Sequence, residues 1–352
     1  MKFSVQLLLT LRETQTHAQV YASALEETRL AEALGFDAVW LAEHHFSVYG
    51  ICPSLAVLAG AIARETRRMR IGTSVVIAPF AHPLRIAEEW AMVDLLSNGR
   101  LDFGLGRGYQ PKEFAGLDVS MARTRERFDE CMEVIRRAWT QDQVTFTGEF
   151  YRVPGIAVFP RPVQQPHPPL WTAAVSPDTY RLAAQRGFKI LTAPSFTPWD
   201  ILRKNYDAYH EEWRRTHGTE AGAEIAMNKI IYVADSSKQA REDVREPIRW
   251  FFTTQAGLIA DAEGVPPDQY RFYRRVRENL LALTDEQALD QAAIVGDADE
   301  VADKIRAHHE ALGVTYFMGS FSRGMADPAK VLRSMRLFGE KVLPRLAQGI
   351  RP

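Results

Sequence analysis

Cysteine is scarce in this sequence, and several common catalytic and metal-binding motifs are absent. The 352 residues include two cysteines, Cys52 and Cys131, which make neither a metal-binding motif nor a disulfide framework. No H-x-H or H-E-x-x-H pattern supports a metal site, and no G-x-S-x-G elbow supports a serine hydrolase. We therefore expect no metal centre and no Ser-His-Asp chemistry.

The sequence also lacks an excess of basic residues and a long apolar run. Its 43 Lys and Arg nearly balance 44 Asp and Glu, whereas nucleic-acid binding needs a phosphate-neutralising excess of positive charge. No apolar run approaches the roughly 20 residues that span a bilayer, and the first residues have no signal-peptide pattern. We expect a cytoplasmic protein with neither a nucleic-acid nor a membrane partner.

Eight short apolar runs alternate with segments of helical spacing. Apolar runs between helical segments are typical of parallel strands that are buried on both faces. Eight such βα units over residues 1–352 predict a single α/β domain, a (β/α)8 TIM barrel, with a doubly wound open sheet as the alternative. The predicted strands are Phe3–Thr10, Ala38–Ala42, Met69–Ile77, Leu101–Leu105, Leu170–Ala174, Lys189–Ala193, Glu224–Ala234 and Val314–Ser320.

Two segments interrupt this alternation. Residues 143–168 alternate around Thr147-Gly148-Glu149 and continue into a Pro-rich connector, which predicts a β-hairpin insertion after the fourth strand. Residues 247–294, after the seventh strand, are too long for a simple loop and rich in aromatic and charged residues, which indicates a lid. His308 and His309 fall on a polar helix, and we expect both at the surface.

The second predicted strand ends in Glu43-His44-His45. In a barrel, the catalytic residues lie at the C-terminal ends of the strands. Successive side chains of a strand face opposite sides, so the two histidines cannot both face one cavity unless the strand has already ended. We favour His44 as the working histidine, with Glu43 and His45 as its partners or as interface groups. A polar strand end with hydrogen-bonded histidines is the alternative.

Two further strand ends indicate an anion site. In Gly104-Leu105-Gly106-Arg107-Gly108-Tyr109 the glycines let a ligand approach the backbone, and Arg107 offers a planar fork of donors to a phosphate. Ser176-Pro177-Asp178-Thr179 begins a helix whose first N–H groups also suit a phosphate. The alternatives are a flexible strand end with a solvent-facing Arg107 and an ordinary helix cap at Ser176.

Taken together, these stretches resemble the bacterial luciferase-like, flavin-dependent monooxygenases, and most closely the branch of the luciferase α-subunit, the alkanal monooxygenases. The resemblance spans nearly the whole chain and is carried by residues 35–46, 71–85, 97–108, 176–179 and 334–338, and by Trp250. It implies a TIM barrel that binds reduced FMN at the C-terminal ends of its strands. It also implies His44 as the catalytic residue and a non-proline cis peptide at Ser74-Val75.

The resemblance also implies a set of ligand-binding residues. Arg107, Ser176 and Thr179 would hold the flavin phosphate, and Ser74, Val75, Gly106 and Gly108 would lie against the cofactor. The substrate pocket would include Glu43, His45 and Trp250. Luciferases carry a reactive cysteine where this chain has Gly106, and a glutamate where it has Val175, which implies an enzyme that does not emit light.

The implied reaction uses reduced FMN from a separate NAD(P)H-dependent flavin reductase. Reaction with O₂ would give a C4a-(hydro)peroxyflavin, which oxidises an aldehyde or another carbonyl compound. A reductase or dehydrogenase that uses the deazaflavin F420 on the same barrel is one alternative, and a non-catalytic flavin-binding accessory subunit is another. Small and apolar faces on the predicted helices Ser54–Arg64 and Pro83–Leu96, through which family members pair, predict a homodimer.

Overall fold

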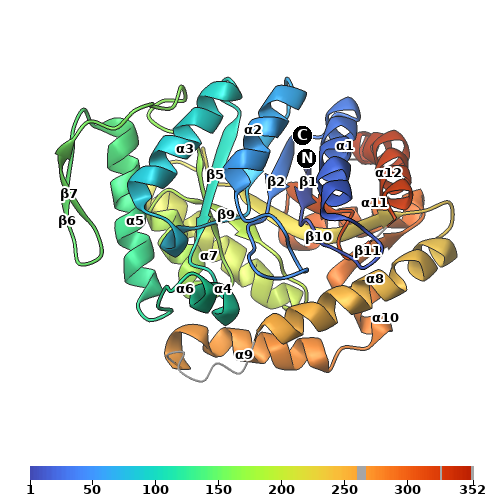
Figure 1. Ribbon diagram of the computed structural model, residues 1–352. Coiled ribbons are helices and arrows are strands. Elements are labelled where there is room, and N and C mark those ends of the chain that lie inside the picture. The colour runs from blue at the N-terminus through green and yellow to red at the C-terminus, as the bar shows by residue number, and fades with distance from the viewer. Residues whose placement is uncertain (260–266, 326, 350–352) are drawn as a thin grey trace.

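The chain forms a closed barrel of eight parallel strands, as the sequence predicts (Figure 1). The computed structural model describes residues 1–259, 267–325 and 327–349, and only the backbone of residues 267–273, 348 and 349. In spatial order the strands are β1 (Lys2–Leu7), β2 (Ala38–Leu41), β3 (Arg70–Thr73), β5 (Leu101–Gly106), β8 (Leu170–Ala173), β9 (Lys189–Thr192), β10 (Ile225–Val233) and β12 (Tyr316–Ser320). Pairing of β12 with β1 closes the ring.

Helices surround the barrel and bury the outer faces of its strands. Because each strand faces the barrel interior on one side and a helix on the other, most of its residues are apolar. Thr16 caps the first helix in a capping box with Gln19, and Pro83 occupies the first turn of the third. The outer helices are α1 (His17–Ala33), α2 (Leu55–Glu65), α3 (Pro83–Leu96), α5 (Thr124–Thr140), α6 (Pro177–Gln185), α7 (Trp199–His217), α11 (Ala298–Leu312), α12 (Pro328–Leu337) and α13 (Leu343–Gly349), the last two joined by the π-helix η3 (Phe338–Val342).

The third predicted strand is divided at Ser74-Val75, where the peptide bond is cis, as predicted. β3 lies before this bond, and β4 (Val76–Ile77) follows it and pairs with β5. A short 3-10 turn, η1 (Ala78–Phe80), then leads to α3. The cis bond therefore lies at the C-terminal end of the barrel.

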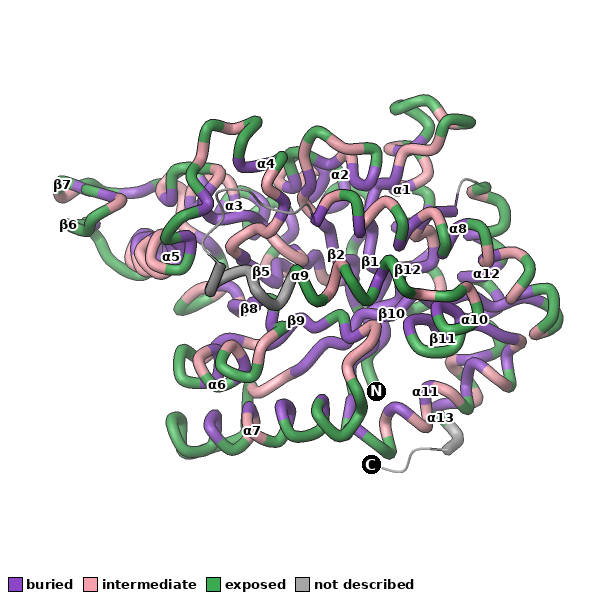
Figure 2. Tube along the Cα trace, turned by 90° about the horizontal axis from the view of Figure 1, so that it is seen from below, coloured by how far each residue is buried: buried purple, intermediate pink, exposed green. Residues whose placement is uncertain are grey.

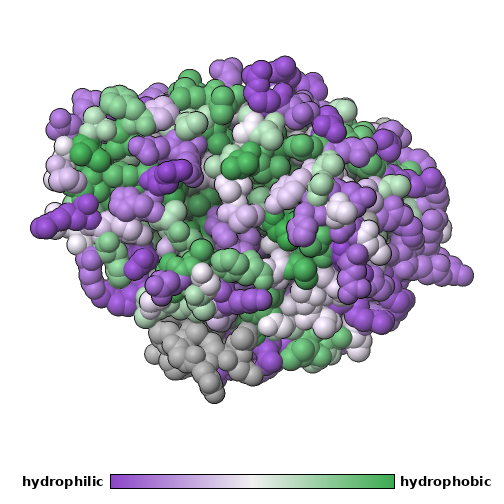
Figure 3. Space-filling view, in the orientation of Figure 1, coloured by the Kyte–Doolittle hydropathy of each residue, from purple (hydrophilic) through white to green (hydrophobic). Residues whose placement is uncertain are grey.

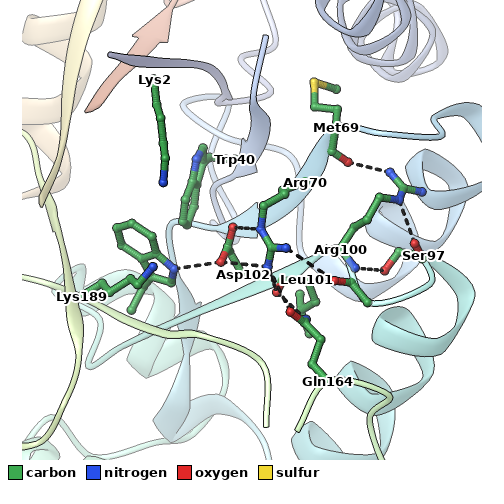
Figure 4. A network of polar contacts seen from close by, with 12 residues as sticks. Lys2, Trp40, Met69, Arg70, Ser97, Arg100, Leu101, Asp102, Gln164 and Lys189 are labelled. Atoms are coloured by element: carbon green, nitrogen blue, oxygen red, sulfur yellow. Dashed lines mark hydrogen bonds and ion pairs between the residues drawn. The ribbon is translucent and has the colours of Figure 1, made fainter. Parts of the chain in front are cut away.

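Charged and aromatic side chains fill the N-terminal end of the barrel (Figure 4). Arg70 on β3 donates two hydrogen bonds to the carboxylate of Asp102 on β5, at 2.6 and 3.1 Å. The indole N–H of Trp171 on β8 donates to the same carboxylate at 3.2 Å. The rings of Trp171 and Trp40 pack edge to face, with centroids 5.0 Å apart. This end of the barrel is a packed core.

The predicted hairpin insertion is present beside the barrel. β6 (Val144–Thr147) and β7 (Arg152–Ile156) pair as antiparallel strands directly after α5. They form a sheet of their own, separate from the barrel.

The segment between β10 and the last barrel strand contains most of the remaining elements. They are α8 (Ser237–Leu258), α9 (Pro267–Leu281), α10 (Asp285–Gln287), the π-helical turn η2 (Ala288–Ala292) and β11 (Ala293–Gly296), which pairs with the end of β10. Pro247, where we placed the start of the lid, lies inside α8. Residues 260–266 of that segment lie outside the described residues. α8 and α9 run along the lower edge of Figure 1, and α9 crosses in front of the strands in Figure 2.

The prediction that His308 lies at the surface is wrong. Its side chain on α11 is buried, with the ring 4.8 Å from the indole of Trp199 and 6.4 Å from the ring of Phe317. Burial lowers the pKa of His308 to about 4. The helix reads as polar, but its inner face packs on the barrel at this position. Among the described helices, none is long and apolar enough to cross a membrane.

Candidate active site

His44 lies just beyond the end of β2, with its side chain buried at the C-terminal mouth of the barrel. Its Nδ1 lies 3.0 Å from Oε1 of Glu113 and 3.0 Å from the amide nitrogen of Gln110. The rings of Tyr49 and Tyr109 stand edge-on to the imidazole, with centroids 4.9 and 6.2 Å away. Both of these polar contacts engage Nδ1, so the orientation of the ring is set by that one nitrogen.

Glu113 favours one tautomer of this imidazole. It lies in the first turn of α4 (Pro111–Gly116), and its Oε1 also accepts the backbone N–H of His45 at 2.9 Å. A carboxylate accepts hydrogen bonds, so it favours the tautomer of His44 that carries its proton on Nδ1. Nε2 is then the basic nitrogen. If Nδ1 instead gives up its proton, the Gln110 amide remains beside it as a donor.

Glu43 and His45 pair with each other. Nε2 of His45 lies 3.0 Å from Oε1 of Glu43, and the other oxygen of Glu43 accepts the backbone N–H of Ile77 at 3.1 Å. Burial raises the pKa of Glu43, although the bonds from His45 and Ile77 lower it. The strand has ended at Leu41, so the two histidines are free to take different partners. This pair fastens the loop after β2 to β4.

The predicted phosphate ligands lie at the ends of two neighbouring strands. Arg107 directly follows β5, and Ser176 begins α6 just beyond β8, which pairs with β5. Nη1 of Arg107 is buried, and no hydrogen-bond partner reaches it within residues 1–259, 267–325 and 327–349. Oγ of Ser176 lies 2.8 Å from Oγ1 of Thr179 and does not cap the N–H groups of its own helix. A guanidinium, two hydroxyls and a helix start fit a phosphate monoester.

Gly106 and Gly108 occupy positions where a larger residue does not fit. A Cβ atom on Gly106 would lie 2.4 Å from Cγ2 of Val75, so this position accepts no side chain while Val75 stays in place. Gly108 has a φ of 76°, a conformation that favours glycine. Ser74 accepts a hydrogen bond from the amide of Gln6 on β1 at 3.5 Å. The side chain of Val75 thus fills the space beside Gly106 on β5.

A chain of polar side chains forms the floor of the mouth. Oγ of Ser320 on β12 donates to Oε1 of Gln6 at 2.6 Å, and the amide of Asn228 on β10 donates to that Oγ at 2.9 Å. Arg323, beyond β12, also donates to Oε1 of Gln6. These contacts run from Ser74 across β1 to β12, so the mouth has polar groups on several of its strands.

Trp250, which we predicted in the substrate pocket, lies on α8 and is half-buried. The guanidinium carbon of Arg12 lies 4.7 Å from the centre of its ring. The next residue, Phe251, is stacked on Tyr49 with ring centroids 5.3 Å apart. Through Tyr49, Phe251 is the α8 side chain that connects to the surroundings of His44.

The sequence prediction missed Gln110 and Glu113, although it included the residues just before them. A signal was present, because Pro111 and Glu113 stand at the first and third positions of a helix that begins right after the Arg107 loop. That pattern places a carboxylate near the end of β5. It does not show that this carboxylate reaches an imidazole 69 positions away.

Comparison with known proteins gives the family. Residues 1–316 match the family described as luciferase-like monooxygenase. The chain belongs to this family. The oxygenase component of flavin-dependent trigonelline monooxygenase from Acinetobacter baylyi is 30% identical over 350 residues, which cover 96% of this chain and 92% of that protein.

Solved structures agree with this luciferase-like assignment. Monooxygenase RslO1 from Streptomyces bottropensis superposes with a TM-score of 0.85 at 30% identity, covering 98% of this chain and 99% of that one. The oxygenating constituent of 3,6-diketocamphane monooxygenase from Pseudomonas putida, solved with FMN, gives 0.81 at 20% identity over 100% and 99% of the two chains, and shows the fold alone. The Acinetobacter relative is named as flavin-dependent, which agrees with the FMN cofactor that the sequence predicts.

Proposed function

We propose that this luciferase-like protein is the oxygenase component of a two-component monooxygenase. It receives reduced FMN from a separate NAD(P)H-dependent flavin reductase and uses O₂ to oxidise an aldehyde or another carbonyl compound, without light emission. The observation that carries the proposal is that a phosphate donor set and a carboxylate-held imidazole lie at the same end of one barrel. The donor set is Arg107, Ser176 and Thr179, and the imidazole belongs to His44.

The residues of this chain fit FMN at its phosphate. The unpaired Nη1 of Arg107 is the hydrogen-bond donor that a phosphate oxygen satisfies, and the start of α6 adds backbone N–H groups. When bound, reduced FMN supplies two electrons to O₂, so that one oxygen atom enters the substrate and the other leaves as water.

His44 serves as the acid and base of the site. With Nδ1 held by Glu113, Nε2 takes a proton from a reacting oxygen and returns it later in the cycle. Tyr49 and Tyr109 stand around the ring and exclude water from it.

We also propose that residues 247–294 act as the lid of this site. Phe251 already contacts Tyr49, one ring away from His44. At Gly324, a Cβ atom would lie 2.4 Å from the carbonyl oxygen of Pro247, so α8 packs closely on the loop after β12. The support for a lid is this close packing of α8 on the mouth.

We further propose a homodimer that pairs through α2 and α3. Val57 on α2 is 75% exposed, and Met92 and Leu96 on α3 are each about half exposed. Figure 3 shows hydrophobic residues, between polar ones, over the part of the surface that these helices form. Such a patch supports an interface. Light scattering that finds only monomer, or a dimer that survives Val57→Glu with Leu96→Glu, would contradict this pairing.

Oxygen uptake in the presence of FMN, NADH, a flavin reductase and a panel of carbonyl compounds tests the proposed reaction. We expect turnover that needs O₂ and falls by about 10²- to 10⁴-fold in His44→Ala. The control is His17→Ala, at an exposed histidine of α1, which should leave turnover unchanged. Full activity in His44→Ala would remove the role of His44. Hydride transfer with F420 under argon, or an absence of product throughout, would contradict a monooxygenase.

A further inference from the structure

A second arginine lies at the mouth of the barrel. Arg323 follows the end of β12 by three residues, and its guanidinium carbon lies 4.8 Å from the centre of the Phe251 ring. It donates to Gln6, but its Nε is buried without a hydrogen-bond partner in the described part of the chain. Among the described residues, no carboxylate forms an ion pair with it. A half-buried cation without a counter-ion is costly, which suggests that an anionic ligand supplies the missing charge.

The barrel places this arginine opposite the phosphate site. Between β12 and β5, three strands lie on either side of the ring: β1, β2 and β3 one way, and β8, β9 and β10 the other. Arg323 follows β12 and Arg107 follows β5, so the two arginines follow strands on opposite sides of the ring. His44 follows β2, the middle strand of the three on one side. A ligand held by Arg323 therefore approaches His44 from the side away from the phosphate donors.

The groups between Arg323 and His44 suit an organic ligand. The ring centroid of Tyr49 lies 4.9 Å from that of the His44 imidazole. Tyr49 also stacks on Phe251, and the Phe251 ring lies under the Arg323 guanidinium. Tyr49 and Tyr109 are hydrogen-bonded to each other, and burial raises the pKa of both hydroxyls, so both stay protonated. Two aromatic walls and neutral hydroxyl donors lie on the path from the cation to the imidazole.

We propose that the substrate is an organic acid whose carboxylate binds Arg323 while its oxidisable carbonyl group lies at His44. The planar fork of an arginine matches a carboxylate, and its free Nε can complete the contact. The carbon skeleton then lies along Tyr49 and Phe251. This inference rests on the proposed function and adds a charged end to the carbonyl substrate.

The experiment compares carbonyl acids with their neutral partners. The probes are 4-formylbenzoate against methyl 4-formylbenzoate, and 4-oxopentanoate against its methyl ester, measured by titration calorimetry on the full chain with FMN present and by oxygen uptake in the reductase assay. In the wild type we expect the acid of at least one pair to bind about 10- to 100-fold more tightly than its ester. Arg323→Met should abolish this preference, and Arg323→Lys should keep part of it.

Two control variants separate the roles of the arginines. Arg12→Met removes a 3.0 Å contact to the carbonyl of Gly324, next to Arg323, and leaves the Arg323 charge in place, so the preference for acids should persist. Arg107→Met should weaken FMN binding, measured by equilibrium dialysis, without reversing the preference for acids.

Several outcomes would overturn this inference. One is that no acid binds more tightly than its ester, and another is that the preference survives Arg323→Met. A third is that Arg323→Met weakens FMN binding as Arg107→Met does, which would assign Arg323 to the flavin. If acids bind through Arg323 but no oxygen-dependent turnover occurs, the carboxylate site stands and the proposed reaction fails.

Discussion

The two ends of this barrel use charged residues in opposite ways. At the N-terminal end, Arg70 and Asp102 satisfy each other through two hydrogen bonds (Figure 4), and Glu224 forms ion pairs with Lys2 and Lys189. At the C-terminal end, Arg107 and Arg323 each have a buried nitrogen without a partner in the described residues. Oε1 of Gln110 and Oε2 of Glu113 are also buried there without a hydrogen-bond partner in the described residues.

The difference separates groups that stabilise the fold from groups that are available to a ligand. A buried ion pair that is fully hydrogen-bonded has no capacity left for a third molecule. Buried polar groups without a partner are unfavourable in folded proteins, and they are concentrated at functional sites. The mouth of this barrel therefore carries a cost in stability that a bound ligand can offset.

The largest effect that we expect from this contrast comes from Glu113→Gln at the mouth. The Gln amide can donate to Nδ1 of His44, which would place the proton on Nε2 and remove the base. We expect kcat to fall by about 100-fold, a smaller loss than the roughly 10⁴-fold known for a wrong tautomer in serine proteases, together with a changed pH profile of kcat. Glu89→Gln on α3, at an exposed i,i+4 pair with Arg85, is the control. An unchanged pH profile would show that Glu113 is only structural.

The opposite end should respond in stability instead. Asp102→Asn leaves Arg70 without its counter-ion, and we expect a loss of about 2 kcal/mol in the free energy of unfolding. This is less than for a fully buried pair, because the Arg70 side chain is 36% exposed. Urea unfolding measures the loss, and kcat should stay within about twofold of the wild type. A large loss of kcat without a loss of stability would break the comparison between the two ends.

A third, smaller effect concerns Arg107. Arg107→Met removes the guanidinium with its unpaired Nη1, and we expect the affinity for FMN to fall by about 10-fold. The free energy of unfolding without FMN should not decrease, since Nη1 has no partner to lose in the described residues. Equilibrium dialysis and urea unfolding give the two numbers. Intact FMN affinity in this variant would place the phosphate elsewhere.

The smallest effects are two pH dependences of opposite sign. Burial alone would raise the pKa of Glu224, but Lys189 and Lys2 lower it, whereas burial dominates at Glu43 and raises its pKa. Glu224 thus contributes stability above its unfolded pKa of about 4.5 and loses that contribution in acid. Glu43 contributes stability at low pH and loses it as the pH rises through its raised pKa.

The matched variants Glu224→Gln and Glu43→Gln test these signs. At pH 7, Glu224→Gln should destabilise the fold and Glu43→Gln should stabilise it, each by about 1 kcal/mol. Both differences should shrink toward pH 4 as the wild-type carboxylates take up protons. Urea unfolding at pH 4, 5.5 and 7 measures them. If both variants change the free energy of unfolding in the same direction at pH 7, the two ends do not differ in how burial and charge act on their carboxylates.

Much of the fold could be predicted from the sequence, because apolar runs and helix starts are local patterns. All eight barrel strands and the hairpin lie where such patterns occur. β11 was missed because it is a short run inside a segment rich in charge. His308 was misplaced because helical polarity does not show which side packs on a barrel strand such as β12.

The candidate site was predictable only in part. His44 and Arg107 stand at strand ends, where the sequence itself directs attention. Glu113 and Arg323 come from segments that reach the mouth only when the ring closes, and their partners His44 and Gln6 are 69 and 317 positions away. Residue patterns over a short stretch of sequence do not reveal contacts between residues that are so far apart in the chain.

Gly106 approaches Val75 so closely that a side chain at position 106 would compete with Val75 for the same space. Any lineage that acquires a thiol at 106 must first, or at the same time, shorten residue 75. Cysteine at 106 alone would push against the side chain of Val75. A luciferase-like cysteine at position 106 therefore requires a second substitution at position 75. Relatives should carry small residues at 75 wherever 106 is not glycine.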